Sequence, residues 1–294
     1  MKKLNKKLGY TICFAIVLII IAGITGCSTT SSKKEDVLTV AVTIVPQETF
    51  VKAVAGDLAE VVTMVPPGRS PESYAPTPKE LQQFSDASIY FTIGISAEDV
   101  NILPKTQDIN KNLKVVSLSD EVAKVYPDRE FAPGSRDPHT WLSPKRAIVM
   151  VRTIARELSA IDPENSGTYE KNANAYIAEI EKADSEIAAL LKDLKGRTFI
   201  MYHPAFGYFA DDYGLNMLSL EEEGKEATAR DLQEIIDIAR AENIKVVFYQ
   251  AEDESKKSKA FAEEIGGRAE LINPLAADYI ENLKKVANMF KELL

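Results

Sequence analysis

Asp137-Pro138-His139-Thr140-Trp141-Leu142-Ser143-Pro144 is the stretch around which this sequence is organised. It contains one of only two histidines in 294 residues and the single tryptophan. The other histidine, His203, directly follows the apolar run 198–202 and also stands beside a proline. One histidine in a loop is commonly a satisfied polar side chain. Two histidines that share this setting indicate that the protein uses both.

Short apolar runs alternate with helical patterns on both sides of this stretch. The strand-like runs are 38–42, 61–65, 89–93 and 114–118, then 198–202, 217–220, 245–249 and 269–272. Helical patterns fall at 47–57, 78–86, 227–242, 254–265 and 278–294. At the second of these, Thr77, Pro78 and Glu80 provide an N-cap, a first-turn proline and a capping-box acid. This alternation predicts an α/β fold with two four-stranded parallel-sheet lobes and flanking helices.

A long helix is predicted between the two lobes. From Tyr169 to Leu194, apolar residues recur at helical spacing. About 30 residues at a rise of 1.5 Å would give a rigid helix of roughly 45 Å, long enough to span both lobes. A coiled-coil arm is the alternative, but a single stripe without heptads favours packing along two domains. We therefore expect an N-terminal lobe at 37–161, a connecting helix at 162–195 and a C-terminal lobe at 196–294.

The N-terminus has the pattern of a secreted lipoprotein. Four lysines precede the uncharged apolar run 12–24, which ends on small residues before Cys27. We predict that residues 1–26 are a cleaved signal peptide and that Cys27 is lipidated. Residues 27–36 would tether the protein to the cell membrane on its extracytoplasmic side, which is periplasmic if an outer membrane exists. An uncleaved signal anchor is the alternative, and it also leaves the domain outside the cell.

Charge and cysteine content limit the possible partners and the disulfide content of the protein. The second cysteine, Cys13, lies inside the predicted signal, so the mature chain would contain no disulfide. The formal net charge is −9, and removal of residues 1–26, with four lysines and no acid, takes it to −13. An acidic body argues against nucleic acid as a partner and is compatible with cations. We expect a monomer.

Four polar side chains follow predicted strands. Glu72 lies in the proline-rich loop after 61–65, and His139 follows the fourth strand after a long loop. His203 and Asn273 follow the first and last strands of the second lobe. Because ligands of open parallel sheets lie beyond the carboxyl ends of the strands, facing lobes would bring these four residues into one cleft. Two imidazoles, a carboxylate and an amide oxygen suit a divalent first-row cation.

Several short motifs together resemble a known family. They are Val65-Pro66-Pro67-Gly68, Tyr74-Ala75-Pro76-Thr77-Pro78, Asp137 to Pro144 as quoted above, Ala205-Phe206-Gly207-Tyr208-Phe209, Tyr213-Gly214-Leu215 and Asn273-Pro274-Leu275. As a set they resemble the zinc- and manganese-binding lipoproteins of ABC importers, the cluster A-I solute-binding proteins. The resemblance covers essentially the whole mature chain. It implies two lobes joined by a long helix, a metal buried between them, and an ABC permease with its ATPase as partners.

The resemblance also assigns metal ligands, with departures from the family pattern. The family's second histidine falls on His139, and its third ligand falls on His203. Its first histidine falls on Glu72, and its late aspartate falls on Asn273. A glutamate that some members carry falls on Gln250, an alternative ligand. Glutamate in place of histidine is a harder donor that favours manganese or ferrous iron, whereas the Irving–Williams order favours zinc, which we expect.

Charged residues near these positions carry further expectations. Asp137 is expected to accept a hydrogen bond from an imidazole N–H, as the neighbours of metal-binding histidines commonly do. Arg69 and Arg136 flank the two ligand loops of the first lobe and are expected to pair with Glu72 or Asp137. A pair between Arg69 and Glu72 would weaken metal binding. Residues 221–223, all glutamate, are expected to form a solvated loop, the alternative being a carboxylate delivered to the cleft.

The sequence therefore predicts a binding protein that captures a divalent cation outside the cell and passes it to a permease. The affinity for the cation should fall as the pH decreases through the histidine range, because protons compete with the metal for the ligands. One alternative is a degenerate homologue that binds another ligand or acts as a surface adhesin. A surface-anchored zinc hydrolase is a further alternative, since two histidines and a glutamate also form catalytic zinc sites. The sequence contains no His-Glu-x-x-His motif, so we expect no enzyme.

Overall fold

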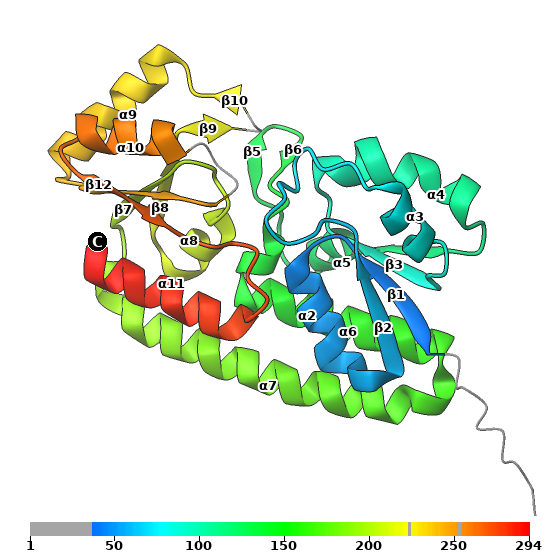
Figure 1. The fold of residues 1–294 in the computed structure, drawn as a ribbon. Coiled ribbons are helices and arrows are strands. Elements are labelled where there is room, and N and C mark those ends of the chain that lie inside the picture. Colours follow the sequence, from blue (N-terminus) through cyan, green and yellow to red (C-terminus); the bar gives the residue numbers. More distant parts are fainter. Residues whose placement is uncertain (1–36, 223–224, 252–254) are drawn as a thin grey trace, which may run out of the picture. The chain divides into compact units, whose positions relative to one another are not determined.

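The first sheet has four parallel strands. The computed structural model describes residues 37–294 except 223–224 and 252–254, so the predicted signal peptide, Cys27 and the tether lie outside the described residues. The strands are β1 (Leu38–Val42), β2 (Ala59–Thr63), β3 (Ile89–Thr92) and β4 (Lys114–Ser117), in the order β2-β1-β3-β4. They coincide closely with the predicted runs. Helices α2 (Val45–Ala55), α3 (Pro78–Phe84), α4 (Leu103–Ile109), α5 (Leu118–Ala123) and α6 (Pro144–Ile161) flank this sheet (Figure 1).

The second sheet repeats the arrangement. Its strands are β7 (Thr198–Met201), β8 (Asn216–Ser219), β11 (Val246–Tyr249) and β12 (Arg268–Leu271), all parallel and in the order β12-β11-β7-β8. Its helices are α8 (Gly207–Tyr213), α9 (Ala229–Ala241), α10 (Ser255–Glu264) and α11 (Tyr279–Leu293). Two parallel four-stranded sheets with flanking helices confirm the predicted fold class.

Local signals explain where several helices begin. Thr77 accepts a hydrogen bond from the backbone N–H of Glu80, whose side chain accepts from the N–H of Thr77 in return, as the capping box predicted. Ser143 caps α6 by accepting from the backbone N–H of Arg146, and Pro144 occupies the first position of that helix. Helix α6 was not predicted from the sequence, although Ser143 and Pro144 form a start signal there.

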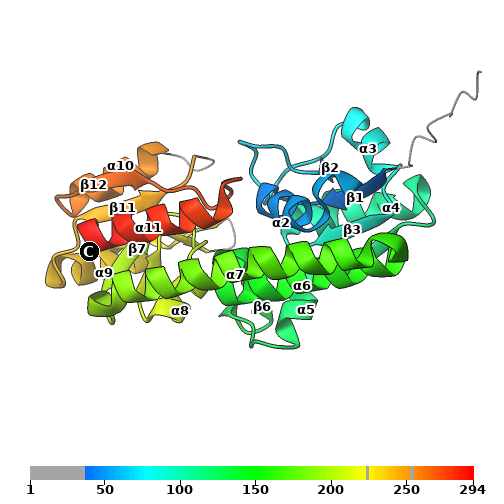
Figure 2. The ribbon, with the colours of Figure 1, turned by 90° about the horizontal axis from the view of Figure 1, so that it is seen from below.

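The predicted connecting helix is α7 (Ser166–Leu191). Its 26 residues are shorter than expected, because single 3-10 turns, η4 (Pro163–Asn165) and η5 (Lys192–Leu194), replace its ends. At 1.5 Å per residue the helix is about 39 Å long. It packs against α2 and α6 beside the first sheet and against α11 beside the second (Figures 1 and 2). A long helix therefore spans both halves of the chain.

Two short hairpins form where the sequence suggested loops. Strands β5 (Glu130–Ala132) and β6 (Ser135–Arg136) pair just before the His139 loop, and Gly134 in their turn has φ 83°. Strands β9 (Glu221–Glu222) and β10 (Lys225–Glu226) form the second hairpin. The expectation of a solvated loop at 221–223 is therefore wrong for Glu221 and Glu222, which belong to a strand.

The hydrophobic core is continuous between the two sheets. One cluster of buried residues contains Val40 and Phe91 of the first sheet together with Phe199 and Phe248 of the second. Ile177 of α7 belongs to the same cluster. The lobe boundaries at 161–162 and 195–196 therefore stay a prediction from the sequence. Within the described residues, none of the helices has the length and apolar character required to span a bilayer.

Phe290 of α11 is the centre of an aromatic group in this core. It is fully buried, and its ring lies 4.7–6.4 Å, centroid to centroid, from four other rings. These belong to Phe199, Phe206, Phe209 and Phe248. The aromatic motif at 205–209 is thus part of the core next to the second sheet.

Candidate metal site

Three of the predicted ligands come together. Glu72 lies in the loop between β2 and α3, His139 lies between β6 and the 3-10 turn η3 (Thr140–Leu142), and His203 lies two residues beyond the end of β7. Each offers one ligand atom, and these atoms all lie within 4.8 Å of one another. The two histidines are buried and Glu72 is partly buried. The loops after strands of both sheets therefore meet at one point.

The two imidazole rings face each other through their Nε2 atoms, which are 3.1 Å apart. A tetrahedral zinc ion with Zn–N bonds of about 2.05 Å would hold two nitrogens about 3.3 Å apart. The observed spacing is close to that value. It is also too short for two nitrogen lone pairs with nothing between them, so a proton or a cation is needed there.

Carboxylates fix the opposite nitrogen of both rings. Asp137 Oδ1 lies 2.8 Å from His139 Nδ1 and also accepts from the His139 backbone N–H at 2.9 Å. Glu221 Oε1 lies 2.6 Å from His203 Nδ1. Because a carboxylate only accepts, each Nδ1 carries the hydrogen and each Nε2 presents its lone pair to the site. This is the arrangement that supports histidine as a metal ligand.

Glu221 lies at the site, although a solvated loop was the first expectation for it and a carboxylate delivered to the cleft only the alternative. Its backbone N–H donates to Tyr202 O, so β9 starts beside the end of β7 and its side chain meets His203. The Glu221 side chain is only 14% exposed. The contact depends on the β9–β10 hairpin, which no local pattern in the sequence predicts.

Asn273, the fourth predicted ligand, has its amide oxygen in a local hydrogen bond. Its side chain is exposed, and its Oδ1 accepts a hydrogen bond from the backbone N–H of Leu275 at 2.9 Å. Asparagine commonly bonds to its own backbone two residues on in this way. Gln250 is buried and lines a small space together with Glu72 and both histidines. The geometry therefore favours Gln250 over Asn273 as the additional polar group beside the site.

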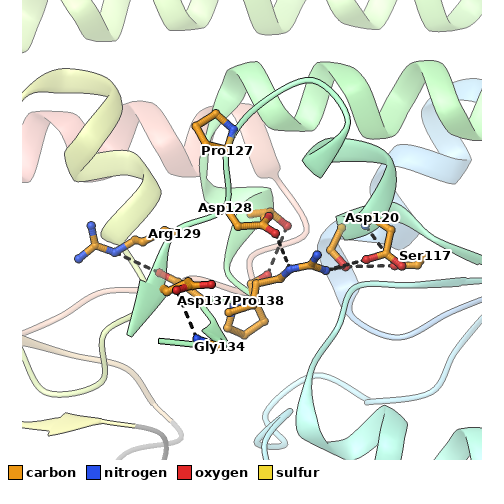
Figure 3. A network of polar contacts seen from close by, with 12 residues as sticks. Ser117, Asp120, Pro127, Asp128, Arg129, Gly134, Asp137 and Pro138 are labelled. Atoms are coloured by element: carbon orange, nitrogen blue, oxygen red, sulfur yellow. Dashed lines mark hydrogen bonds and ion pairs between the residues drawn. The ribbon is translucent and has the colours of Figure 1, made fainter. Parts of the chain in front are cut away.

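Arg136, in the segment just before His139, has partners other than the expected Glu72 or Asp137. Arg136 pairs through Nη1 with Asp120 at 2.7 Å and through Nε with Asp128 at 2.8 Å, and Figure 3 labels these two aspartates. The hydrogen bond from Arg136 holds the pKa of Asp120 below its usual range. Asp137 instead lies 3.4 Å from Arg129 Nε. The expectation that Arg136 pairs with Asp137 is wrong, and Asp137 keeps Oδ1 for His139.

Glu72 is not neutralised by Arg69. Arg69 is exposed, and no ion pair joins it to Glu72 in the described part of the chain. The Glu72 Oε2 atom accepts from Ser96 Oγ at 3.4 Å, a weak hydrogen bond. The Glu72 carboxylate therefore stays available to a cation.

Contacts between the two halves lie directly beside the site. Trp141 Nε1 donates to Pro274 O at 2.8 Å, and Tyr279 Oη donates to Trp141 O at the same distance. Tyr208 Oη donates to Asp137 O at 3.0 Å. These bonds join residues far apart in the sequence and hold the ligand loops close to one another.

A buried carboxylate shapes the loop that follows β3. Glu98, 1% exposed, lies in the π-helical turn η2 (Glu98–Ile102). It accepts from the backbone N–H groups of Ile93 at 2.8 Å and Gly94 at 2.7 Å, and from the hydroxyl of Thr43. Burial raises the pKa of the Glu98 carboxyl to about 7. Glu98 thus orients the segment that carries Ser96 beside Glu72, a role that the sequence analysis missed.

The space around the three ligand residues is unequal on its two sides. One side is a cavity of about 270 Å³, lined by Gly94, Ser96, Phe131, Ser135, Arg136 and Pro138 in addition to the three ligand residues. The other side, next to Gln250 and Trp141, holds only about 10 Å³. An organic ligand therefore has room on the first side.

Paired α/β sheets with a ligand site where their loops meet define the two-lobed class of solute-binding proteins. The chain belongs to the ZnuA family, described as zinc-uptake complex component A, periplasmic, whose pattern matches residues 40–293. The resemblance read from the motifs is thereby confirmed at the level of the family.

Similar proteins agree with this assignment. The chain is 32% identical over 237 residues to the iron ABC transporter substrate-binding lipoprotein MtsA of Streptococcus pyogenes serotype M6 (strain ATCC BAA-946 / MGAS10394), covering 76% of this chain and 74% of that protein. It is 28% identical over 278 residues to the high-affinity zinc uptake system protein ZnuA of Bacillus subtilis (strain 168), covering 90% and 87%. The crystal structure of a ZnuA deletion mutant with zinc bound superimposes with a TM-score of 0.82 at 37% identity, covering 88% of this chain and 98% of the other.

Proposed function

We propose that this protein is the extracytoplasmic binding component of an ABC importer. It captures a divalent transition metal as cargo through Glu72, His139 and His203 and delivers the ion to a membrane permease that is driven by an ATPase. Membership of the ZnuA family and the names of the relatives support the transport role. The three converging side chains support these particular ligands.

The observation that carries the proposal is the pair of imidazoles. Their Nε2 atoms are 3.1 Å apart, and both rings are fixed by buried or nearly buried carboxylates. Two lone pairs held this close repel each other unless a proton or a cation lies between them, and a divalent cation satisfies both at once. Glu72 then supplies the negative charge that a divalent ion requires.

Zinc is the metal we favour. Two imidazoles and one carboxylate suit zinc, and such sites bind zinc more tightly than manganese or ferrous iron in the Irving–Williams order. One relative is named for zinc and another for iron, so the donor set has to be tested against both metals.

The remaining parts of the proposal concern the site's surroundings. Lipid on Cys27 would anchor the mature chain to the outer face of the cell membrane as a monomer. The domain boundaries expected from the sequence would place the cation between the two lobes. Binding followed by release, without chemical change of a substrate, agrees with the transport names of the relatives, so we propose that the protein is not an enzyme.

The test is a metal titration of the mature chain prepared without a histidine tag. Zinc, manganese and ferrous iron are titrated against wild type, Glu72→Ala and His139→Ala, with Glu234→Ala as the control because Glu234 is exposed on α9. Loss of a direct ligand should weaken zinc binding by more than the roughly 10- to 100-fold expected for a supporting residue. The control should bind as wild type does.

Absence of binding to wild type would remove the transport proposal and favour a degenerate homologue or an adhesin. Unchanged zinc affinity in Glu72→Ala would remove Glu72 from the ligand set. Zinc-dependent cleavage of an ester, peptide or lactam by wild type would favour the hydrolase.

A further inference from the structure

The ligand set of the described residues is incomplete for zinc. Glu72, His139 and His203 provide three donors, and four-coordinate zinc takes a fourth. Asn273 bonds to its own loop instead. On the Gln250 side the space is only about 10 Å³, enough for one water molecule at most, so an organic ligand has no room there. The cavity of about 270 Å³ on the other side is where a fourth ligand can enter.

The lining of this cavity suits an organic anion. Arg136 uses Nε and Nη1 for Asp128 and Asp120, which in the described part of the chain leaves the two N–H groups of Nη2 for a ligand. Ser96 and Ser135 add hydroxyl groups, and Phe131 and Pro138 add apolar surface. The planar guanidinium can donate these two N–H groups to a carboxylate of the ligand.

The size of the cavity is informative as well. A cavity of about 150 Å³ accepts a molecule as large as benzene. The cavity beside Glu72, at about 270 Å³, is therefore larger than one water ligand requires and holds a small organic molecule. Inorganic phosphate would leave the apolar wall of Phe131 and Pro138 without a partner.

We propose that a small organic carboxylate completes the metal site, so that the cargo is a metal–carboxylate complex. One carboxylate oxygen binds the ion opposite the Gln250 side, and the rest of the molecule lies between Arg136 and Phe131. This inference rests on the proposed function of the same site. It assigns Arg136 a role in recognising the companion anion, separate from the three residues that hold the ion.

The experiment uses the mature chain loaded with cobalt(II), whose visible spectrum reports coordination geometry. Cobalt binding is measured first, and then lactate, acetate and phosphate are titrated into the loaded protein. Lactate and acetate should change the spectrum saturably, whereas phosphate should not. Arg136→Gln should weaken the carboxylate response about tenfold and leave cobalt affinity unchanged, because the lost interaction is a charge-assisted hydrogen bond to the anion alone.

Two further variants make the outcome specific. Arg230→Gln removes the same charge from an exposed site on α9 and should respond as wild type does. Ser135→Leu should fill the cavity and abolish the carboxylate response while cobalt still binds, which keeps the test valid if Arg136→Gln does not fold.

The results separate this inference from the proposed function. If cobalt does not bind at all, the proposed function fails and the inference fails with it. If cobalt binds and no carboxylate changes the spectrum, only the inference is overturned. A response to phosphate alone, or an equal carboxylate response in wild type and Ser135→Leu, also overturns it.

Discussion

Replacing Glu221 tests whether the carboxylate behind His203 strengthens metal binding. The Glu221 side chain is 14% exposed and lies 2.6 Å from His203 Nδ1. Glutamine at this position keeps an acceptor for the Nδ1–H but removes the charge that makes the imidazole a better donor. Alanine removes both.

The magnitude follows from the kind of interaction that is lost. A hydrogen bond to a charged group contributes about 1.5–3 kcal/mol, which corresponds to roughly 10- to 150-fold in affinity. Loss of a supporting partner of a metal-binding histidine commonly costs 10- to 100-fold. We therefore expect zinc affinity about tenfold weaker in Glu221→Gln and about 100-fold weaker in Glu221→Ala.

The assay is a competition titration of zinc against a chromophoric chelator. Glu234→Gln is the matched control, because it removes the same charge from an exposed position on α9. Thermal unfolding of each metal-free variant shows whether the fold is retained. If Glu221→Gln and Glu221→Ala both bind zinc within twofold of the control, the contact with His203 has no part in metal binding, and the reasoning is refuted.

Two further predictions concern stability. For Glu98, the carboxyl pKa rises from 4.5 to about 7 on folding, so the folded state binds the proton more tightly and loses stability as the pH rises between these values, by up to about 3 kcal/mol. Urea unfolding across this range should show a smaller decrease in Glu98→Gln than in wild type, and equal slopes would contradict the role of Glu98. For Phe290, which is fully buried among four aromatic rings, replacement by alanine should lower the free energy of unfolding by about 3–5 kcal/mol. Val125→Ala, at a 59% exposed side chain, should change it by less than about 0.5 kcal/mol, and similar losses in both variants would contradict the packing argument.

Much of the fold was predictable because its signals are local. Apolar runs of strand length mark the eight strands of the two four-stranded sheets, and the apolar stripe from Tyr169 onward marks α7. Helix α6 was missed even though Ser143 and Pro144 form a recognisable start. The hairpins β5–β6 and β9–β10 are too short for a periodic pattern to reveal them.

The site was predictable where a residue's position follows from its strand. Glu72 and both histidines lie in the segments that follow strands, and the ends of parallel strands bring these segments together. Glu221 and Glu98 depend on contacts made across the fold, which a linear pattern does not contain. Asn273 likewise follows a strand, but its amide oxygen accepts a hydrogen bond from the backbone N–H of Leu275, two residues further along.

The helix α7 has a consequence for how the protein melts. Helix α7 packs against α2, α6 and α11, so the unfolding of either half exposes part of its buried surface to solvent. Both halves should therefore unfold in one cooperative transition, with equal calorimetric and van't Hoff enthalpies. A cation held where the two sheets meet would then raise the melting temperature of the whole chain at once, instead of producing a second, more stable peak.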